Sequence, residues 1–97
     1  MSSADDTADM IQTAAGQVTG EGNWHGRKVF IAAVYAALDM AARGVSHEEF
    51  GATLVALHQA RLIRLSRADL VEAMPLALKD ASEIEAFGER FHFIRID

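Results

Sequence analysis

Residues 62–96 read LIRLSRADLVEAMPLALKDASEIEAFGERFHFIRI, and the order of patterns in this stretch decides the fold. The apolar segment at 62–65 is typical of a strand. Two short helical segments follow at 67–73 and 75–81, and a β-hairpin is predicted at 83–96. With two helices upstream, the order is helix, helix, strand, helix, helix, hairpin. We therefore expect an α+β fold, mainly helical, with a small antiparallel sheet.

The hairpin prediction depends on the turn at its centre. Gly88-Glu89 suits a two-residue type II′ turn, which would pair Phe87 with Arg90. The resulting register places Ala86 opposite Phe91, Ile84 opposite Phe93, and Glu85 opposite His92. An apolar face and a charge-compatible outer pair then arise from one turn assignment. The alternative is the start of a helix, because Ser82 and Glu85 also have the spacing of a capping box.

Local signals define the helix boundaries upstream of the hairpin. Ser46 and Glu49 form a predicted capping box for a helix that runs to about Arg61. An earlier helix is predicted from Arg27 to Arg43, where Gly44 ends it. The helix 67–73 has a weaker cap in Ser66 with Asp69, and Met74-Pro75 ends it because proline disfavours helical backbone in the residue before it.

The predicted helix 27–43 is apolar on more than one side, which indicates burial against more than one neighbour. Ile31 and Tyr35 lie outside its main apolar stripe. They are therefore candidate contacts with another protein or with a second copy of the chain in a homodimer. The alternative is that both are partly exposed on a monomer. Trp24 is either a lid over the core or an anchor for a partner.

The first 22 residues differ in composition from the rest of the chain. They contain four carboxylates and few large apolar groups, so burial is not expected to offset the entropy lost on ordering. The sequence predicts a disordered acidic tail at 1–22 and one domain at 23–97. Because a domain of this size is marginally stable and the chain has no cysteine, a partner protein or a second copy would add stability.

The element order in residues 46–96 resembles the winged helix-turn-helix superfamily. The resemblance implies that the helix 75–81 is the reading helix and that Phe87 to Arg90 form the tip of the wing. At this tip Phe87 is a candidate protein contact. The candidate contacts with nucleic acid are the cations on the predicted reading helix, the wing and the strand region: Arg64, Arg67, Lys79 and Arg90.

Charge disfavours nucleic acid as the partner. The chain has a formal charge of −5, and residues 23–97 contain nine cations and ten carboxylates. DNA-binding domains usually have a basic surface, since neutralising phosphates supplies much of the affinity. The predicted reading helix has Lys79 beside Asp80 and no arginine, asparagine or glutamine to read base edges. The sequence favours a small non-enzymatic module for protein interaction, with nucleic-acid binding as the alternative.

No pattern in the sequence indicates an enzyme, a metal site or a cofactor. His47 and His58 would lie roughly 16 Å apart along a helix, too far to share a metal ion. No acid or histidine is placed by the sequence to activate a serine. The longest apolar run, 29–42, is shorter than the ~20 residues that span a bilayer, and the acidic N-terminus does not resemble a secretory signal. We therefore expect a cytoplasmic protein without membrane contact.

Overall fold

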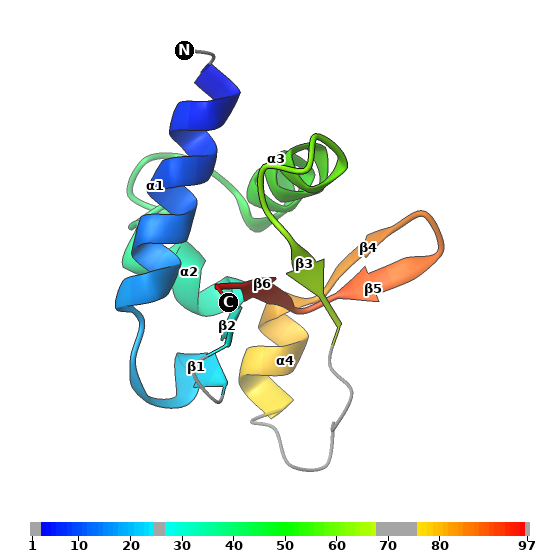
Figure 1. The fold of residues 1–97 in the computed structure, drawn as a ribbon. Helices are drawn as coiled ribbons and strands as arrows, with labels where there is room; N and C mark the ends of the chain where they lie inside the picture. Colours follow the sequence, from blue (N-terminus) through cyan, green and yellow to red (C-terminus); the bar gives the residue numbers. More distant parts are fainter. Residues whose placement is uncertain (1–2, 25–26, 68–75, 97) are drawn as a thin grey trace.

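The structure is a computed structural model that describes residues 3–24, 27–67 and 76–96. Its helices are α1 (Ser3–Gln17), α2 (Ile31–Ala37), α3 (His47–Gln59) and α4 (Leu76–Ser82), with a 3-10 turn η1 (Gly20–Gly22). Its strands are β1 (Asn23–Trp24), β2 (Lys28–Phe30), β3 (Leu65–Ser66), β4 (Ile84–Ala86), β5 (Glu89–Phe91) and β6 (Phe93–Arg95). The fold is α+β with a small antiparallel sheet, as the sequence predicts (Figure 1).

The strand β6 is at the centre of the main sheet, whose strand order is β1-β2-β6-β3. Ile94 lies opposite Val29 on one side and opposite Leu65 on the other. All three side chains are buried. Just before β6, His92 donates its backbone N–H to the Ser66 carbonyl at 2.8 Å. The chain thus leaves the β4–β5 hairpin at His92 and enters the main sheet.

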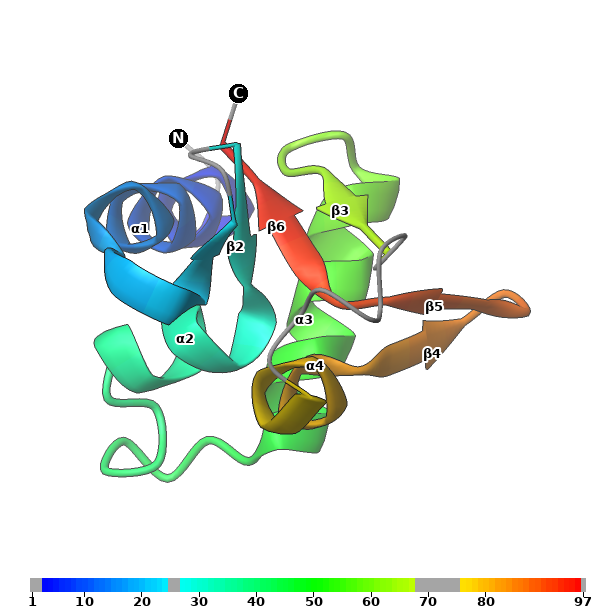
Figure 2. The same cartoon turned by 90° about the horizontal axis from the view of Figure 1, so that it is seen from below.

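The two faces of the main sheet pack against different helices. Val29 and Ile94 belong to the core formed with α1, α2 and α3. Phe30 and Phe93 are adjacent in sequence to Val29 and Ile94, so their side chains point to the opposite face of the sheet. Their rings are 4.5 Å apart between centroids. The helix α4 contacts β2, and α3 and α4 lie on opposite sides of the sheet (Figures 1 and 2).

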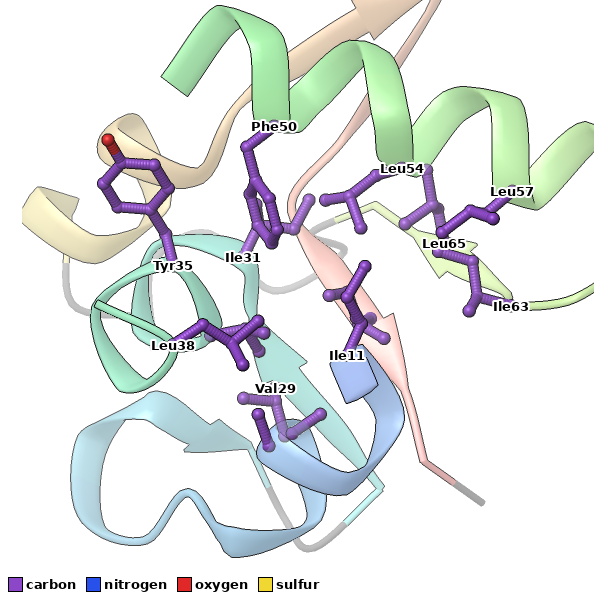
Figure 3. Packing of buried hydrophobic residues seen from close by; sticks show 14 of the residues in the cluster. Ile11, Val29, Ile31, Tyr35, Leu38, Phe50, Leu54, Leu57, Ile63 and Leu65 are labelled. Carbon is purple, nitrogen blue, oxygen red and sulfur yellow. The ribbon is translucent and has the colours of Figure 1, made fainter. Parts of the chain in front are cut away.

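The core is built around the apolar stripe of α3. Its buried side chains recur at helical spacing: Phe50, Leu54 and Leu57. Ile31 of α2, Leu38 directly after α2, and Ile63 and Leu65 around β3 belong to the same buried cluster (Figure 3). The core therefore joins residues from both halves of the chain.

The N-terminal segment differs from the expected disordered tail at 1–22. Residues Ser3–Gln17 form α1, which buries Ile11 completely and also buries Ala8 and Ala15 against the core. The Gln12 amide donates to the Leu62 carbonyl at 3.3 Å. The composition of residues 1–22 did not indicate this helix. Its buried residues are Ile11 and three alanines at helical spacing, and alanine loses no rotamer entropy on burial.

The segment 27–43 is not one helix, contrary to the prediction. Lys28–Phe30 form β2, and the helix α2 covers only Ile31–Ala37. Asp39 and Gly44 then take positive φ values of 53° and 77° in the turn region before α3. The apolar run that resembles a helix buried on several sides therefore contains β2, an inner strand of the main sheet. A strand buried on both faces also reads as a continuous apolar run.

The predicted capping box of α3 is confirmed. The Ser46 hydroxyl accepts a hydrogen bond from the Glu49 backbone N–H at 3.0 Å. The Glu49 carboxylate accepts one from the Ser46 N–H at 3.3 Å. The helix ends at Gln59, near the predicted boundary at Arg61. Both hydrogen bonds join residues that are three positions apart in sequence, so the capping box does not depend on the rest of the fold.

The elements between α3 and the hairpin agree in part with the prediction. A short strand β3 (Leu65–Ser66) stands at the end of the apolar segment predicted as 62–65. The helix α4 covers Leu76–Ser82 and ends one residue after the predicted 75–81, while Pro75 lies outside the described residues. Most of the predicted helix 67–73, with its cap residue Asp69, lies outside the described residues.

The β4–β5 hairpin is present, but its predicted register is wrong. Ala86 pairs with Glu89, Glu85 with Arg90, and Ile84 with Phe91. Phe87 and Gly88 form the turn, and both have positive φ values, 55° and 75°. Two positive φ angles define a type I′ turn, which replaces the expected type II′ turn. The shift leaves Phe93 free to pair with Phe30 in the main sheet.

The burial of Ile11 leads to a prediction for α1. Ile11→Ala should lower the free energy of unfolding by about 2–4 kcal/mol, because it leaves a cavity in the core. Chemical denaturation followed by circular dichroism measures this change. Met10→Ala, at an exposed neighbour in the same helix, is the control and should change stability by less than about 0.5 kcal/mol. Equal, small effects of both substitutions would contradict the packing of α1.

Candidate functional site

Two of the residues predicted to contact a partner are buried inside the chain. Ile31 is 4% exposed and Tyr35 is 8% exposed. The Tyr35 ring stacks on His47 at 3.9 Å between centroids, and its hydroxyl donates to the Val45 carbonyl. The expectation that these residues face another protein is therefore not met. Ile31 and Tyr35 are covered by other parts of the same chain, because residues of α1 and α3 pack in one core with those of α2.

Phe87 has the opposite environment. It lies at the tip of the β4–β5 hairpin and is 73% exposed. The hairpin projects from the rest of the molecule (Figures 1 and 2). The side chains of Trp24 and Lys79, two further predicted contacts, lie outside the described residues.

The backbone of Phe87 is also strained. Its φ of 55° is in the left-handed region, where side chains other than glycine, asparagine and aspartate are disfavoured. The first central position of a type I′ turn usually holds asparagine, aspartate or glycine. Phenylalanine in this conformation has a backbone strain that destabilises the fold, and burial of its ring within the chain does not offset that strain. Among the described residues, three besides glycine have positive φ, and Phe87 is the apolar one; the others are Asp39 and Arg61.

The predicted nucleic-acid contacts whose side chains the structure describes come from two regions, the ends of β3 and the β4–β5 sheet. Arg64 and Arg67 flank the strand β3 and are exposed. Arg90 lies in the separate β4–β5 sheet, with its guanidinium 3.8 Å from the Glu83 carboxylate. That carboxylate also lies 3.4 Å from Nε2 of His92, whose side chain is buried. Glu83 therefore connects the start of β4 to the junction between β5 and β6.

The helix α4 lies at the position of the predicted reading helix, and its last residue is tied to α2. The Ser82 hydroxyl accepts a hydrogen bond from the Ala32 N–H at 2.9 Å, and α4 packs against both α2 and β2. Among the side chains of α4 that the structure describes, the exposed ones are Ala77, Asp80 and Ala81. Two methyl groups and a carboxylate provide no bidentate donor for base edges.

The structure contains a groove between α3 and β4 that the sequence analysis missed. Its volume is about 530 Å³. The groove is lined by one face of α3 along its full length and by four consecutive residues at β4: His47, Glu48, Gly51, Ala52, Val55, Ala56 and Gln59, with Glu83, Ile84, Glu85 and Ala86. At its base, a Cβ atom on Gly51 would lie 3.4 Å from the Ile84 side chain, so helix and strand approach closely there.

The walls of the groove are apolar and its rim is acidic. Val55, Ile84 and Ala86 are half-buried against the core, and the small side chains of Ala52 and Ala56 keep the space open. Glu48, Glu83 and Glu85 are exposed at the rim, and no lysine or arginine is among the lining residues. A groove with these properties suits an apolar segment that also has positive charges.

The only sequence signal for the groove is the small residues on the outer face of α3. Ala52 and Ala56 recur at helical spacing opposite the large apolar stripe, and Gly51, which is buried, lies between them and the stripe. The other wall comes from β4, more than twenty residues away in sequence. Its contact with α3 depends on the tertiary fold, so no local pattern predicts it.

The histidines that the sequence analysis excluded as metal ligands have structural roles. Nδ1 of His58 accepts a hydrogen bond from the Leu65 N–H at 3.1 Å. Within 3–24, 27–67 and 76–96, no group of three or more histidine, aspartate or glutamate side chains is placed to bind a metal. In the same residues, no helix combines the length and apolar character needed to cross a bilayer.

The chain matches no protein-family model, no curated protein and no solved structure. The hairpin tip and the groove are therefore interpreted from their own geometry and chemistry.

The strain at Phe87 leads to a stability prediction. Phe87→Asn should raise the free energy of unfolding by about 0.5–1.5 kcal/mol, because asparagine tolerates the left-handed conformation. Gly88→Val in the same turn should lower it by about 1–3 kcal/mol. Thermal unfolding followed by circular dichroism measures both changes. A destabilised Phe87→Asn variant would show that the ring of Phe87 supports the fold.

Proposed function

We propose that this chain is a small non-enzymatic protein-binding module of winged-helix type. The chain order α3, β3, α4, β4–β5 supports the winged-helix assignment, as does the pairing of β3 with the strand that continues from the hairpin. In this assignment the hairpin is the wing. The proposal assigns binding to the wing and not to α4.

Exposed Phe87 is the observation that carries the proposal. Of the large apolar side chains that the structure describes, only Phe87 and Met10 are exposed, and Met10 is only 37% exposed. Aromatic side chains are enriched at the energetically important centres of protein interfaces. A projecting ring on a strained turn can enter a pocket of a partner with little change in the rest of the domain.

Charge supports a protein partner over nucleic acid. The hairpin has Glu83, Glu85 and Glu89 against Arg90 as its only cation. The exposed side chains described on α4 add Asp80. Neither surface that winged helices use for DNA has net positive charge: the hairpin has three carboxylates against one arginine, and in α4 Lys79 stands beside Asp80.

A photocrosslinking experiment tests the proposal. A benzoylphenylalanine that replaces Phe87 should crosslink to a discrete protein in cells of the source organism, because the ring lies in the interface. The same group in place of Met10, on the surface of α1, is the matched control and should not give this product. Phe87→Asn, which should fold stably, should fail to compete for the partner. Equal crosslinking from both positions, or efficient competition by Phe87→Asn, would contradict the proposal.

The charge distribution also leads to a prediction for DNA. Duplex DNA should bind with a dissociation constant at or above ~10⁻⁵ M near physiological salt, without sequence preference. Arg64→Ala and Arg67→Ala should change this value little. Fluorescence anisotropy at several salt concentrations measures the binding. Nanomolar, sequence-dependent binding would favour a DNA-binding winged helix, with Lys79 and Arg90 as the next residues to replace.

A further inference from the structure

The groove between α3 and β4 is lined by an edge of β4 and not by one of its faces. Successive side chains of a strand point to opposite faces, so a groove over one face would be lined by alternate residues. Here four consecutive residues, 83–86, line it. The backbone of β4 therefore faces the groove, with the side chains of Glu83 and Glu85 on one side and those of Ile84 and Ala86 on the other.

This edge has no strand beside it among the described residues. The second sheet has the order β4-β5, and β4 pairs only with β5. In an antiparallel pair, every second residue directs its N–H and C=O away from its partner strand. Ala86 and Glu89 flank the two-residue turn, so Glu85 is the residue of β4 that directs both groups outward. The N–H of Glu83, the next outward residue, already donates to the Asp80 carbonyl at 3.4 Å. The groups of Glu85 can accept another strand, and peptides commonly bind to an open sheet edge in this way.

We propose that the groove binds an extended peptide as an added strand on β4, and that this peptide alternates basic and apolar side chains. The inference rests on the proposed protein-binding function and specifies the chemistry of the partner. The main chain of the peptide pairs with β4. Its two sets of side chains meet two different surfaces.

The alternation follows from the two sides of β4. An added strand places its side chains beside those of β4 on each face. On one face the neighbours are Glu85, whose carboxylate favours lysine or arginine, and Glu83, whose carboxylate already lies 3.8 Å from the Arg90 guanidinium and 3.4 Å from Nε2 of His92. On the other they are Ile84 and Ala86, and the wall of α3 supplies Val55 and Ala52. That face favours valine or another small apolar residue.

The charges also exclude a second copy of the chain as the occupant. Two β4 edges that pair with each other would place Glu83 and Glu85 of one copy beside the same carboxylates of the other. Like charges in neighbouring positions of a sheet are destabilising. The acidic edge therefore opposes self-association and accepts a basic strand.

Synthetic peptides test the pairing and the charge. The probe is a capped peptide of sequence Lys-Val-Lys-Val-Lys-Val, with Glu-Val-Glu-Val-Glu-Val as the control, titrated into the full chain and followed by NMR. The basic peptide should bind about threefold to tenfold more tightly than the acidic one at low salt, and this preference should fall as salt rises. Amide shifts should concentrate at residues 83–86 and on α3 at residues 52–55. Equal binding of the two peptides, or shifts elsewhere, would overturn the inference.

Backbone methylation distinguishes an added strand from a peptide held only by its side chains. Two isomers of the basic peptide are N-methylated at alternate residues, one on each edge of the extended chain. Strand addition predicts that one isomer binds and the other does not, because only one edge of the peptide faces β4. Equal affinities of the two isomers would overturn strand addition.

A charge reversal tests the role of the rim. Glu85→Lys should remove the preference for the basic peptide, because one of the three carboxylates at the groove becomes a cation. Glu89→Lys changes the same charge in the same hairpin, but position 89 is outside the groove, so its preference should stay basic. Equal responses of the two variants would show a general effect of net charge and overturn the inference.

The inference and the proposed function fail separately. If benzoylphenylalanine at position 87 crosslinks to a partner but neither peptide binds the groove, the protein-binding module stands and strand addition on β4 is wrong. If the basic peptide binds at residues 83–86 but Phe87 contacts no partner, strand addition stands and the tip of the hairpin is not the anchor.

Discussion

The structure depends on the burial of β6 between two other strands. Ile94 pairs with Val29 on one side and with Leu65 on the other, so this strand connects the N-terminal and C-terminal halves of the chain. The backbone on both sides of β6 is bonded in the same way: Arg95 donates to the Arg64 carbonyl and Ile96 donates to the Arg27 carbonyl, both at 2.9 Å. Because each edge of β6 is occupied, its polar backbone groups can be buried at low cost.

The position of β6 determines how α2 and the hairpin are held. The N-terminus of α2 has no side-chain cap of its own. Instead, its first N–H groups donate to the His92 carbonyl at 3.0 Å and to the Ser82 hydroxyl at 2.9 Å. Both acceptors come from the C-terminal segment. The same segment therefore forms the sheet, closes the start of a helix and sets where the hairpin leaves the molecule.

The surface features proposed for binding do not take part in the packing of the core. Phe87 lies beyond the last paired residues of the hairpin, and the groove lies between α3 and β4, with the close approach of Gly51 and Ile84 in its lining. One feature is a strained aromatic residue and the other is an open strand edge. Natural proteins usually protect such edges, often with charge. The glutamates along β4 give that protection against self-pairing and at the same time define which strand the edge accepts.

The sequence by itself determined the features that depend on residues close together in the chain. The capping box of α3 needs only Ser46 and Glu49, and the hairpin needs only the alternation on both sides of a turn that contains Gly88. The faces of the hairpin were also predictable, because the register shift of two residues keeps Ile84 and Phe91 on the same side. The tertiary structure decided the rest. The register was set by the pairing of Phe93 with Phe30, far away in sequence, and β2 is a strand because β6 binds it. The helix α1 is ordered because a core formed by distant residues accepts Ile11. The groove is formed by α3 and β4 together, and the sequence of neither element indicates that it contacts the other.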